Sequence, residues 1–283
     1  TADIYYVQPI PPSTLNAKRT ADASGNIYSP ILSTANFKIS GTSQGLLVQD
    51  GVNQPFVIYQ IGTGGFAARL TKNYNQWRNV STTLDDREYV PIGKQMFILN
   101  SILFIVAPDG KSLMRSITGR YLDFMIVVDS NGNKLPTEEE GGANRLSFAF
   151  DFDSVTHAST CNIPDAFICA TANNIRIIGL NYDIMLFSEP TFRKITNIQA
   201  GVVNQFSFIE LTGSGDYGFV DSEGIISFNG VQQFKFNGRN TVFSLTISKI
   251  IKGIKQTKPC AVNFNNYSFF NIDTIYGNLI AVF

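Results

Sequence analysis

The sequence predicts an all-β protein, because apolar and polar residues alternate along most of the chain and glycine-containing turns separate the alternating stretches. Such alternation places every second side chain on one face of a strand, as in a half-buried sheet. The low charge is a third observation: only 16% of the 283 residues are charged, with 22 basic and 22 acidic residues. The polar face of each sheet must therefore come mainly from Asn, Ser, Thr, Gln and Gly.

The predicted strands form two groups, which differ in how much apolar surface they carry. Clean alternation predicts strands with one polar face at residues 36–40, 145–153, 205–211, 232–236 and 241–248. Longer apolar runs predict more deeply buried strands at residues 55–61, 95–106, 121–128 and 175–187. Asp-Gly or Asn-Gly pairs, which supply the positive φ angles of tight hairpins, stand at residues 109–110, 131–132, 229–230 and 237–238. Adjacent strands are therefore expected to be mostly antiparallel.

One short helix is expected at residues 65–77. Phe66, Leu70, Tyr74 and Trp77 fall at spacings of four, four and three, which would form one apolar stripe along a helix.

The first part of the chain reads as an extended N-terminal arm covering residues 1–30. Pro9, Pro11 and Pro12 lie in it, and a polar stretch follows them, so the segment offers little apolar surface for a core of its own. We interpret it as an assembly arm.

Two β-sandwich or jelly-roll-type domains are expected after the arm. The first would span residues 31–189, where strands are long and connections substantial. The second, residues 190–283, would be more compact, with short strands about every 10 residues. The boundary is set at Pro190 because proline interrupts strand pairing and the apolar periodicity lapses there.

A glycine-rich segment at residues 62–67 matches the pattern G-x-G-x-x-A, and Asp85 and Asp86 follow about twenty residues later, as in dinucleotide-binding folds. Such a fold also needs alternating strands and helices and a second parallel strand before the acidic residue. The chain lacks that alternation, so a structural turn is the favoured interpretation and no cofactor is expected.

Two small clusters invite a catalytic or metal-binding interpretation. His157, Cys161 and Cys169 could form a Cys–His nucleophile or a three-ligand metal site, but their spacing matches no strong signature. Asp151 and Asp153 share one strand face and could act as a carboxylate pair or bind a hard cation, yet they also fit the polar side of an amphipathic strand. The sequence thus predicts no catalytic or metal-binding residues, and no enzyme. With three cysteines, one pair could form a disulfide and one thiol would remain.

Four lysines recur every three residues near the end of the chain: Lys249, Lys252, Lys255 and Lys258. Isoleucines lie between them, so a short helix would carry amines on one side and apolar residues on the other. That arrangement suits contact with lipid headgroups or phosphates, although a solvated lysine face is the simpler interpretation.

Charge balance limits the classes of function. Coating a nucleic acid requires many Lys and Arg residues to neutralise phosphates, whereas here the formal net charge is zero and only Lys18 and Arg19 are basic in the arm. Direct sequence-specific nucleic-acid binding is not expected. Low charge instead favours burial against other protein surfaces, because stable interfaces deplete charged residues in their centres.

In strand number, extended arm and a helix within a long connection, the chain resembles viral coat proteins of the jelly-roll type, and most of all the double jelly-roll major capsid proteins of membrane-containing phages. The resemblance lies in architecture and covers the whole chain without a motif. It implies a homotrimer within a larger shell, contacts with other virion proteins and an internal membrane. One departure is the short second region, which leaves less than the usual room for eight strands.

These expectations combine into one main hypothesis: a self-assembling coat subunit of an icosahedral virion. The first alternative is a capsid vertex or spike protein. The second is a surface adhesin or carbohydrate-binding β-sandwich module, which the same strand pattern and the tyrosines also suit.

Overall fold

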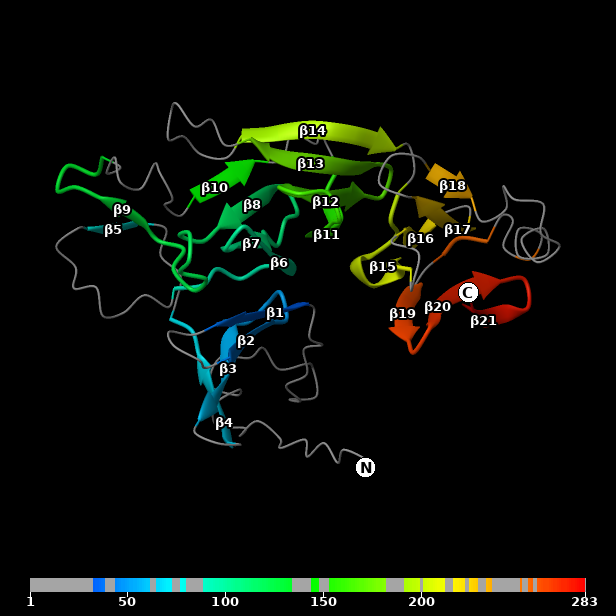
Figure 1. The fold of residues 1–283 in the computed structure, drawn as a ribbon, viewed down its shortest axis with the longest axis horizontal. Helices are drawn as coiled ribbons and strands as arrows, with labels where there is room; N and C mark the ends of the chain where they lie inside the picture. The colour runs from blue at the N-terminus through cyan, green and yellow to red at the C-terminus, as the bar shows by residue number, and fades with distance from the viewer. Residues whose placement is uncertain are drawn as a thin grey trace. The chain divides into compact units, whose positions relative to one another are not determined.

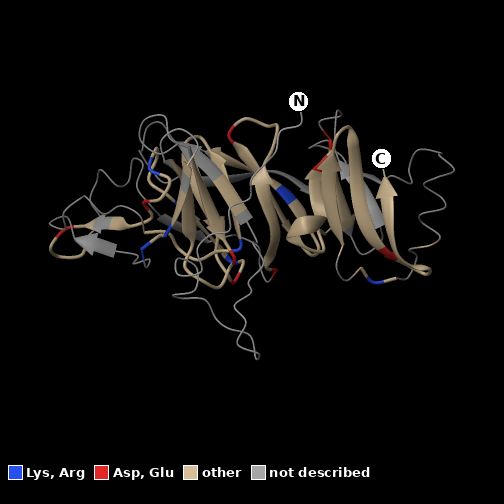
Figure 2. Cartoon of the chain, turned by 90° about the horizontal axis from the view of Figure 1, so that it is seen from below, with Lys and Arg blue, Asp and Glu red and all other residues tan. Residues whose placement is uncertain are grey.

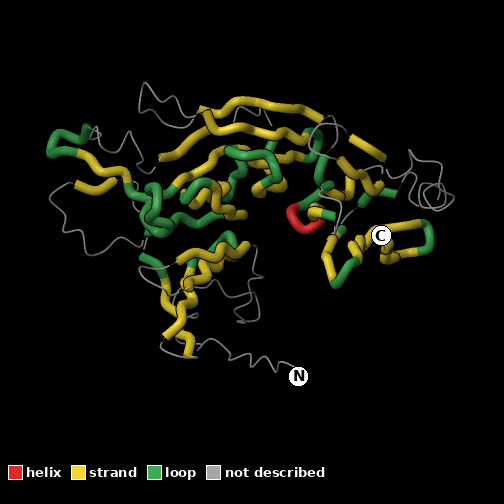
Figure 3. Tube along the Cα trace, viewed as in Figure 1, coloured by secondary structure: helices red, strands yellow, loops and turns green. Residues whose placement is uncertain are grey.

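The computed structural model describes residues 33–38, 44–61, 65–72, 77–79, 89–133, 144–147, 153–181, 191–198, 201–211, 216–221, 224–228, 233–235, 250, 254–256 and 259–282. In these ranges the chain consists of β-strands joined by turns, with a single-turn 3₁₀ helix (η1, Gln205–Ser207) that is drawn red in Figure 3. The predicted all-β class is confirmed for this part of the chain. The arm residues Pro9, Pro11 and Pro12 lie outside the described residues.

Two compact units make up the chain. The first comprises Thr1–Met96, Ser101–Pro108 and Met114–Arg145, and the second comprises Phe97–Asn100, Asp109–Leu113 and Leu146–Phe283. This division differs from the predicted boundary between residues 189 and 190.

The first sheet is an antiparallel meander in chain order: β1 (Ser33–Lys38), β2 (Gln44–Gln49), β3 (Phe56–Ile61) and β4 (Gly65–Leu70) (Figure 1). Leu47 and Val57, which pair across β2 and β3, are fully buried. Buried Gln49 ties β2 to the segment before β6, because its Oε1 accepts a hydrogen bond from the Gly93 amide at 2.6 Å and its Nε2 donates to the Pro91 carbonyl at 3.3 Å.

The predicted helix at residues 65–77 is wrong. Gly65–Leu70 is strand β4, paired with β3 from Phe56↔Leu70 to Ile61↔Gly65, and Trp77–Asn79 is strand β5. Residues four apart share a face in a strand as well as in a helix, so the spacing of Phe66 and Leu70 did not distinguish the two. Pairing with β3 decided in favour of the strand. The glycine-rich segment therefore leads into a strand, not into the helix that a dinucleotide site requires.

The predicted long strand at residues 95–106 is two strands, β6 (Gln95–Leu99) and β7 (Ile102–Val106), which pair as neighbours. Asn100 and Ser101 form the turn between them with φ of 51° and 61°. Two successive positive φ angles match the right-handed twist of a hairpin, and Asn tolerates them better than most residues. β8 (Ser112–Arg115) and β10 (Asn144–Ser147) complete a sheet of order β10-β8-β7-β6.

Two of the predicted Gly turns lie in described segments. Gly110 and Gly132 have φ of 68° and 84°, as the sequence predicted. The predicted strand at 121–128 is shorter than expected, because only β9 (Ile126–Val128) is a strand, and it pairs in parallel with β5. The predicted strand at 241–248 and the turns at 229–230 and 237–238 lie outside the described residues.

In the second unit, the next sheet is an antiparallel meander of β11 (Val155–Thr160), β12 (Ala166–Thr171), β13 (Ile175–Asn181) and β14 (Thr191–Ile198). Every residue of β12 is buried. Ile168 and Ile177 pair across β12 and β13 and pack with Phe208, Tyr217 and Phe219 in one core cluster. Because β14 pairs with β13, this sheet continues past the predicted domain boundary.

The last part of the second unit contains two further antiparallel meanders. One is β15 (Phe208–Glu210), β16 (Tyr217–Asp221), β17 (Gly224–Phe228) and β18 (Gln233–Lys235). The predicted strand at 205–211 is thus a strand only from Phe208 on. Asn204 caps η1, the helical turn just before β15: its side chain accepts from the Phe206 amide, and its own amide donates to Ser207 Oγ. The other meander is β19 (Cys260–Phe264), β20 (Tyr267–Thr274) and β21 (Gly277–Val282).

Candidate functional site

Most of the residues singled out in the sequence are not gathered into a site by the described part of the structure. Lys255 is exposed, whereas Lys249, Lys252 and Lys258 lie outside the described residues, so their shared face stays a prediction. Next to Lys255, Gln256 is buried and forms two hydrogen bonds with the backbone of Asp273 in β20. Its Nε2 donates to the Asp273 carbonyl and its Oε1 accepts from the Asp273 amide, both at 2.9 Å. This segment therefore packs against the C-terminal sheet.

The single histidine of the chain, His157, is a packed residue of β11. Its ring stacks on Phe208 with centroids 4.4 Å apart, and its two nitrogens bond the Gln205 carbonyl at 3.2 Å and Ser159 Oγ at 3.0 Å. Burial lowers the pKa of His157 to about 4, and the bond to Gln205 opposes this shift only in part. The ring is therefore neutral at pH 7 and joins β11 to η1.

The three thiols are free, and their surroundings differ. Burial raises the pKa of Cys161 and raises that of Cys169 well above its ordinary value, with Arg176 opposing the second shift. An activated cysteine needs a lowered pKa, because the thiolate is the nucleophile. Cys161 and Cys169 thus have the properties of packed thiols. Cys260 is exposed on β19.

Asp153 has a structural role at the end of the β12–β13 hairpin. Its Oδ2 accepts from Thr171 Oγ1 at 3.3 Å and from Asn173 Nδ2 at 3.0 Å, which holds the turn between the two strands. Asp151, its predicted partner, lies outside the described residues. Among the residues that can be described, no three His, Cys, Asp or Glu side chains come together as a metal site.

The described feature with the clearest capacity for binding is the C-terminal sheet, β19-β20-β21. Positive φ angles at Asn265 (52°) and Gly277 (97°) allow the tight turns that fold residues 260–282 into three antiparallel strands. Burial alternates along β20, so Ser268, Phe270 and Ile272 point into the protein. Phe270 and Ile272 pack with Val220 and Ala281, and partly buried Ile209, Leu211 and Ile250 cover this cluster.

The opposite side of this sheet is apolar and exposed, and we call it the outer face. The register places Val262, Phe269 and Val282 in one row across the three strands, and Phe264 beside Tyr267 in the next. Cys260, Asn271 and Ile280 form a third row. Val262, Phe264 and Ile280 are 58%, 65% and 66% exposed, and Phe269 is half-buried. Apolar residues therefore occupy both faces of this sheet.

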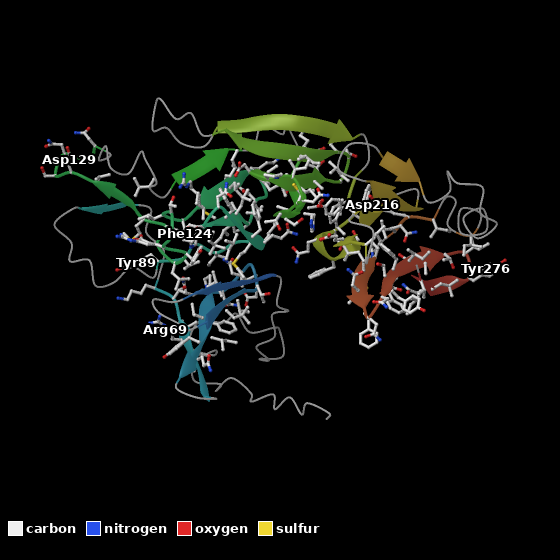
Figure 4. All side chains as sticks on the ribbon, viewed as in Figure 1. Arg69, Tyr89, Phe124, Asp129, Asp216 and Tyr276 are labelled. Carbon is white, nitrogen blue, oxygen red and sulfur yellow. The ribbon has the colours of Figure 1, made fainter. Side chains whose placement is uncertain are left out.

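Charge is nearly absent from this sheet. Asp273 is the sole charged residue from Pro259 to Val282, and it lies in the row with Asn278, whose Nδ2 donates to its carboxylate at 3.1 Å. Figure 2 shows these C-terminal strands almost wholly in tan. Tyr276, 75% exposed, lies at the tip of the β20–β21 hairpin (Figure 4). The outer face thus has an apolar centre and a polar end.

Sequence reasoning missed the outer face because period-2 alternation indicates a strand only when the two faces differ. In residues 260–282, apolar residues occur at positions that face both sides of the sheet. Such a stretch shows no alternation, so it indicates either a fully buried strand or no strand at all. The usable signal was the scarcity of charge, since Asp273 is the single charged residue of that stretch.

Comparisons with known proteins do not assign a family. No protein-family model matches the chain, and no curated protein matches it. Among solved structures, a chain in the structure of the yeast heterotrimeric Nup82-Nup159-Nup116 nucleoporin complex is similar at 10% sequence identity, with a TM-score of 0.38 over 88% of this chain and 75% of that chain. A likeness of this size does not define a shared fold. In the described part of the chain, no helix has the length and apolar character to cross a membrane.

Proposed function

We propose that this chain is a self-assembling structural protein of a virion, a coat subunit that forms an icosahedral shell. The observation that carries the proposal is the exposed apolar outer face of β19-β20-β21, where Val262, Phe264 and Ile280 are more than half exposed. Contiguous exposed apolar surface of this size is typical of interaction sites, because it promotes association. A subunit that is buried among neighbours requires one.

The overall composition supports the same proposal. Interfaces deplete charged residues at their centres, and 16% charged residues is well below the ~25% of ordinary globular domains. The all-β architecture fits a coat protein, although many unrelated functions use such folds. The jelly-roll arrangement, the homotrimer, the internal membrane and the neighbouring virion proteins are parts of the proposal that rest on the resemblance alone. So does a position in the capsid, whereas the expectation of no direct sequence-specific nucleic-acid binding rests on the balanced charge of the chain.

Size-exclusion chromatography with light scattering tests self-assembly. We expect the protein at high concentration to elute as one or more multiples of its 31.2 kDa mass. Electron microscopy of the native source then tests the shell, since a coat subunit must appear in regular particles. A chain that stays monomeric at every concentration, both alone and with the other proteins of its source, contradicts the proposal.

A second candidate function is a surface adhesin or carbohydrate-binding module, and the exposed tyrosines favour it. Tyr267 and Tyr276 present large accessible rings, and aromatic rings are common platforms for sugars. A glycan array distinguishes the two functions. Specific sugar binding by the isolated protein that is lost in Tyr276→Ala, without any assembly, favours the adhesin. A vertex or spike protein would assemble with the shell but occupy few positions in electron micrographs.

A further inference from the structure

The outer face of the C-terminal sheet is large for a surface that stays in water. It carries six apolar side chains in adjacent rows: Val262, Phe264, Tyr267, Phe269, Ile280 and Val282. Large side chains offer ~150–250 Å² each, and about half of that is exposed here, so six of them present roughly 450–750 Å². That area lies at or above the upper end of the ~300–600 Å² of the largest apolar patch on a typical monomer, and it approaches the ~800 Å² that each partner contributes to a standard interface.

The chemistry of the face suits a second copy of the same chain better than a charged partner. A lipid surface or a nucleic acid would be met by basic residues, but the charged residue of this sheet is Asp273, at its polar end. An uncharged apolar centre meets its own copy without like-charge repulsion, and the net charge of the whole chain is zero. In an isologous contact the same patch serves both partners, so this one face is sufficient.

We infer that two copies of this chain pack outer face against outer face, so that β19-β20-β21 of each forms one layer of an intermolecular β-sandwich. The inference rests on the proposed self-assembly and names the surface that carries it. Sheets stacked in this way lie ~10 Å apart with interdigitated side chains, which buries the row Val262–Phe269–Val282 at the centre. The polar row of Asp273 and Asn278 then lies at the rim, as in ordinary interfaces.

Cys260 provides a direct measurement, because it lies on the outer face in the row of Ile280, and its thiol is free and exposed. Alkylation of the full-length protein, followed by peptide mass spectrometry, reports its accessibility. If a second copy covers the face, the rate falls at least about tenfold between ~1 µM and ~1 mM protein, since a modest interface gives a micromolar Kd. If a segment of the same chain covers the face, the rate is low and independent of concentration.

The matched variants are Ile280→Lys on the outer face and Val52→Lys elsewhere. Both residues are exposed, at 66% and 59%, so both variants are expected to fold, and the unfolding midpoint of each checks this. Ile280→Lys brings two ammonium groups into an apolar contact and should weaken association about 100-fold, which restores the alkylation of Cys260 at high concentration. Val52→Lys should behave as the unmodified protein. Val262→Thr, which keeps the branched shape, should give a smaller loss.

The outcomes separate the inference from the proposed function. Assembly that is lost in Ile280→Lys and kept in Val52→Lys, with concentration-dependent protection of Cys260, supports both. Assembly that persists unchanged in Ile280→Lys overturns the inference and leaves the proposed function standing. Concentration-independent protection of Cys260 also overturns the inference, in favour of a cover from the same chain. A protein that neither assembles nor protects Cys260 overturns both.

Discussion

Two antiparallel meanders of the second unit, β11–β14 and β19–β21, show what separates a core sheet from a sheet that offers a face. All six residues of β12 are buried, including those on the face opposite the main core, where Phe167 stacks on Phe97 with centroids 5.0 Å apart. In β20, burial alternates, and one face stays accessible. Similar apolar strands are thus covered on both faces in one sheet and keep one accessible face in the other, depending on what packs against them.

The largest expected effect on stability comes from removing a buried side chain from the covered sheet, β11–β14. Phe167→Ala removes a fully buried ring from β12 and should lower the free energy of unfolding by about 3–5 kcal/mol, through lost burial and a residual cavity. Chemical denaturation monitored by fluorescence measures this. A cost below about 1 kcal/mol would show that β12 is not the core strand we describe.

Acid should weaken the β11–β14 region through His157. The unfolded histidine has an ordinary pKa of 6.5, and burial lowers the folded value to about 4. The neutral ring is the folded form, so its contribution is complete above pH 6.5 and is lost as the pH falls from 6.5 to 4. The lost stability is about 3 kcal/mol, from 1.36 kcal/mol per pKa unit.

Denaturation curves between pH 4 and pH 8 test this expectation. His157→Gln, which keeps a donor and an acceptor but cannot titrate in this range, should flatten the dependence by that amount. An equally steep dependence in the variant would assign the effect to other groups.

Replacing a glycine by alanine should cost more beside the β11–β14 sheet, where Gly201 is crowded, than in the open β20–β21 turn. The Cβ of an alanine there would lie 1.6 Å from the Ala172 carbonyl oxygen, in the turn between β12 and β13, so the backbone must shift. Gly201→Ala should destabilise by about 2–3 kcal/mol. The matched control is Gly277→Ala in the β20–β21 turn, where nothing lies within 4 Å and only the positive φ is unfavourable. That variant should cost about 1 kcal/mol, and similar values for the two would contradict the close approach.

The smallest effect is expected on the outer face itself. Phe264→Ala should change the free energy of unfolding by less than about 0.5 kcal/mol in dilute protein, because the side chain is mostly exposed. The same substitution should weaken association at high concentration, so light scattering provides the second measurement. A loss of stability as large as that of Phe167→Ala would show that Phe264 is covered within its own chain.

Local pattern predicted the parts of the fold that depend on neighbouring residues. β3 and β18 coincide closely with predicted strands, β1 overlaps its predicted strand at residues 36–38, and Gly110 and Gly132 adopt the positive φ that their turns require. Prediction failed at residues 65–70, where i and i+4 spacing is common to helices and strands and only pairing with β3 decides. It also failed to divide residues 95–106, where an Asn100-Ser101 turn lacks the usual glycine.

The candidate site shows even more clearly the difference between what neighbouring residues predict and what distant residues decide. The grouping of His157 with Cys161 and Cys169 was a matter of closeness in the sequence, whereas the structure joins His157 to Gln205 and Phe208, about fifty residues away. The outer face was not predicted, since no local pattern states which side of an apolar strand will be covered.

By itself, the sequence determined the all-β class, the turns that need glycine or asparagine, and the scarcity of charge, because these depend on backbone preference and composition. Only the tertiary structure decided which apolar strands became core and which kept a face in water. Coverage depends on pairing and packing between residues far apart in the chain, as when Phe270 and Ile272 pack against Val220 while Val262 and Ile280 remain exposed.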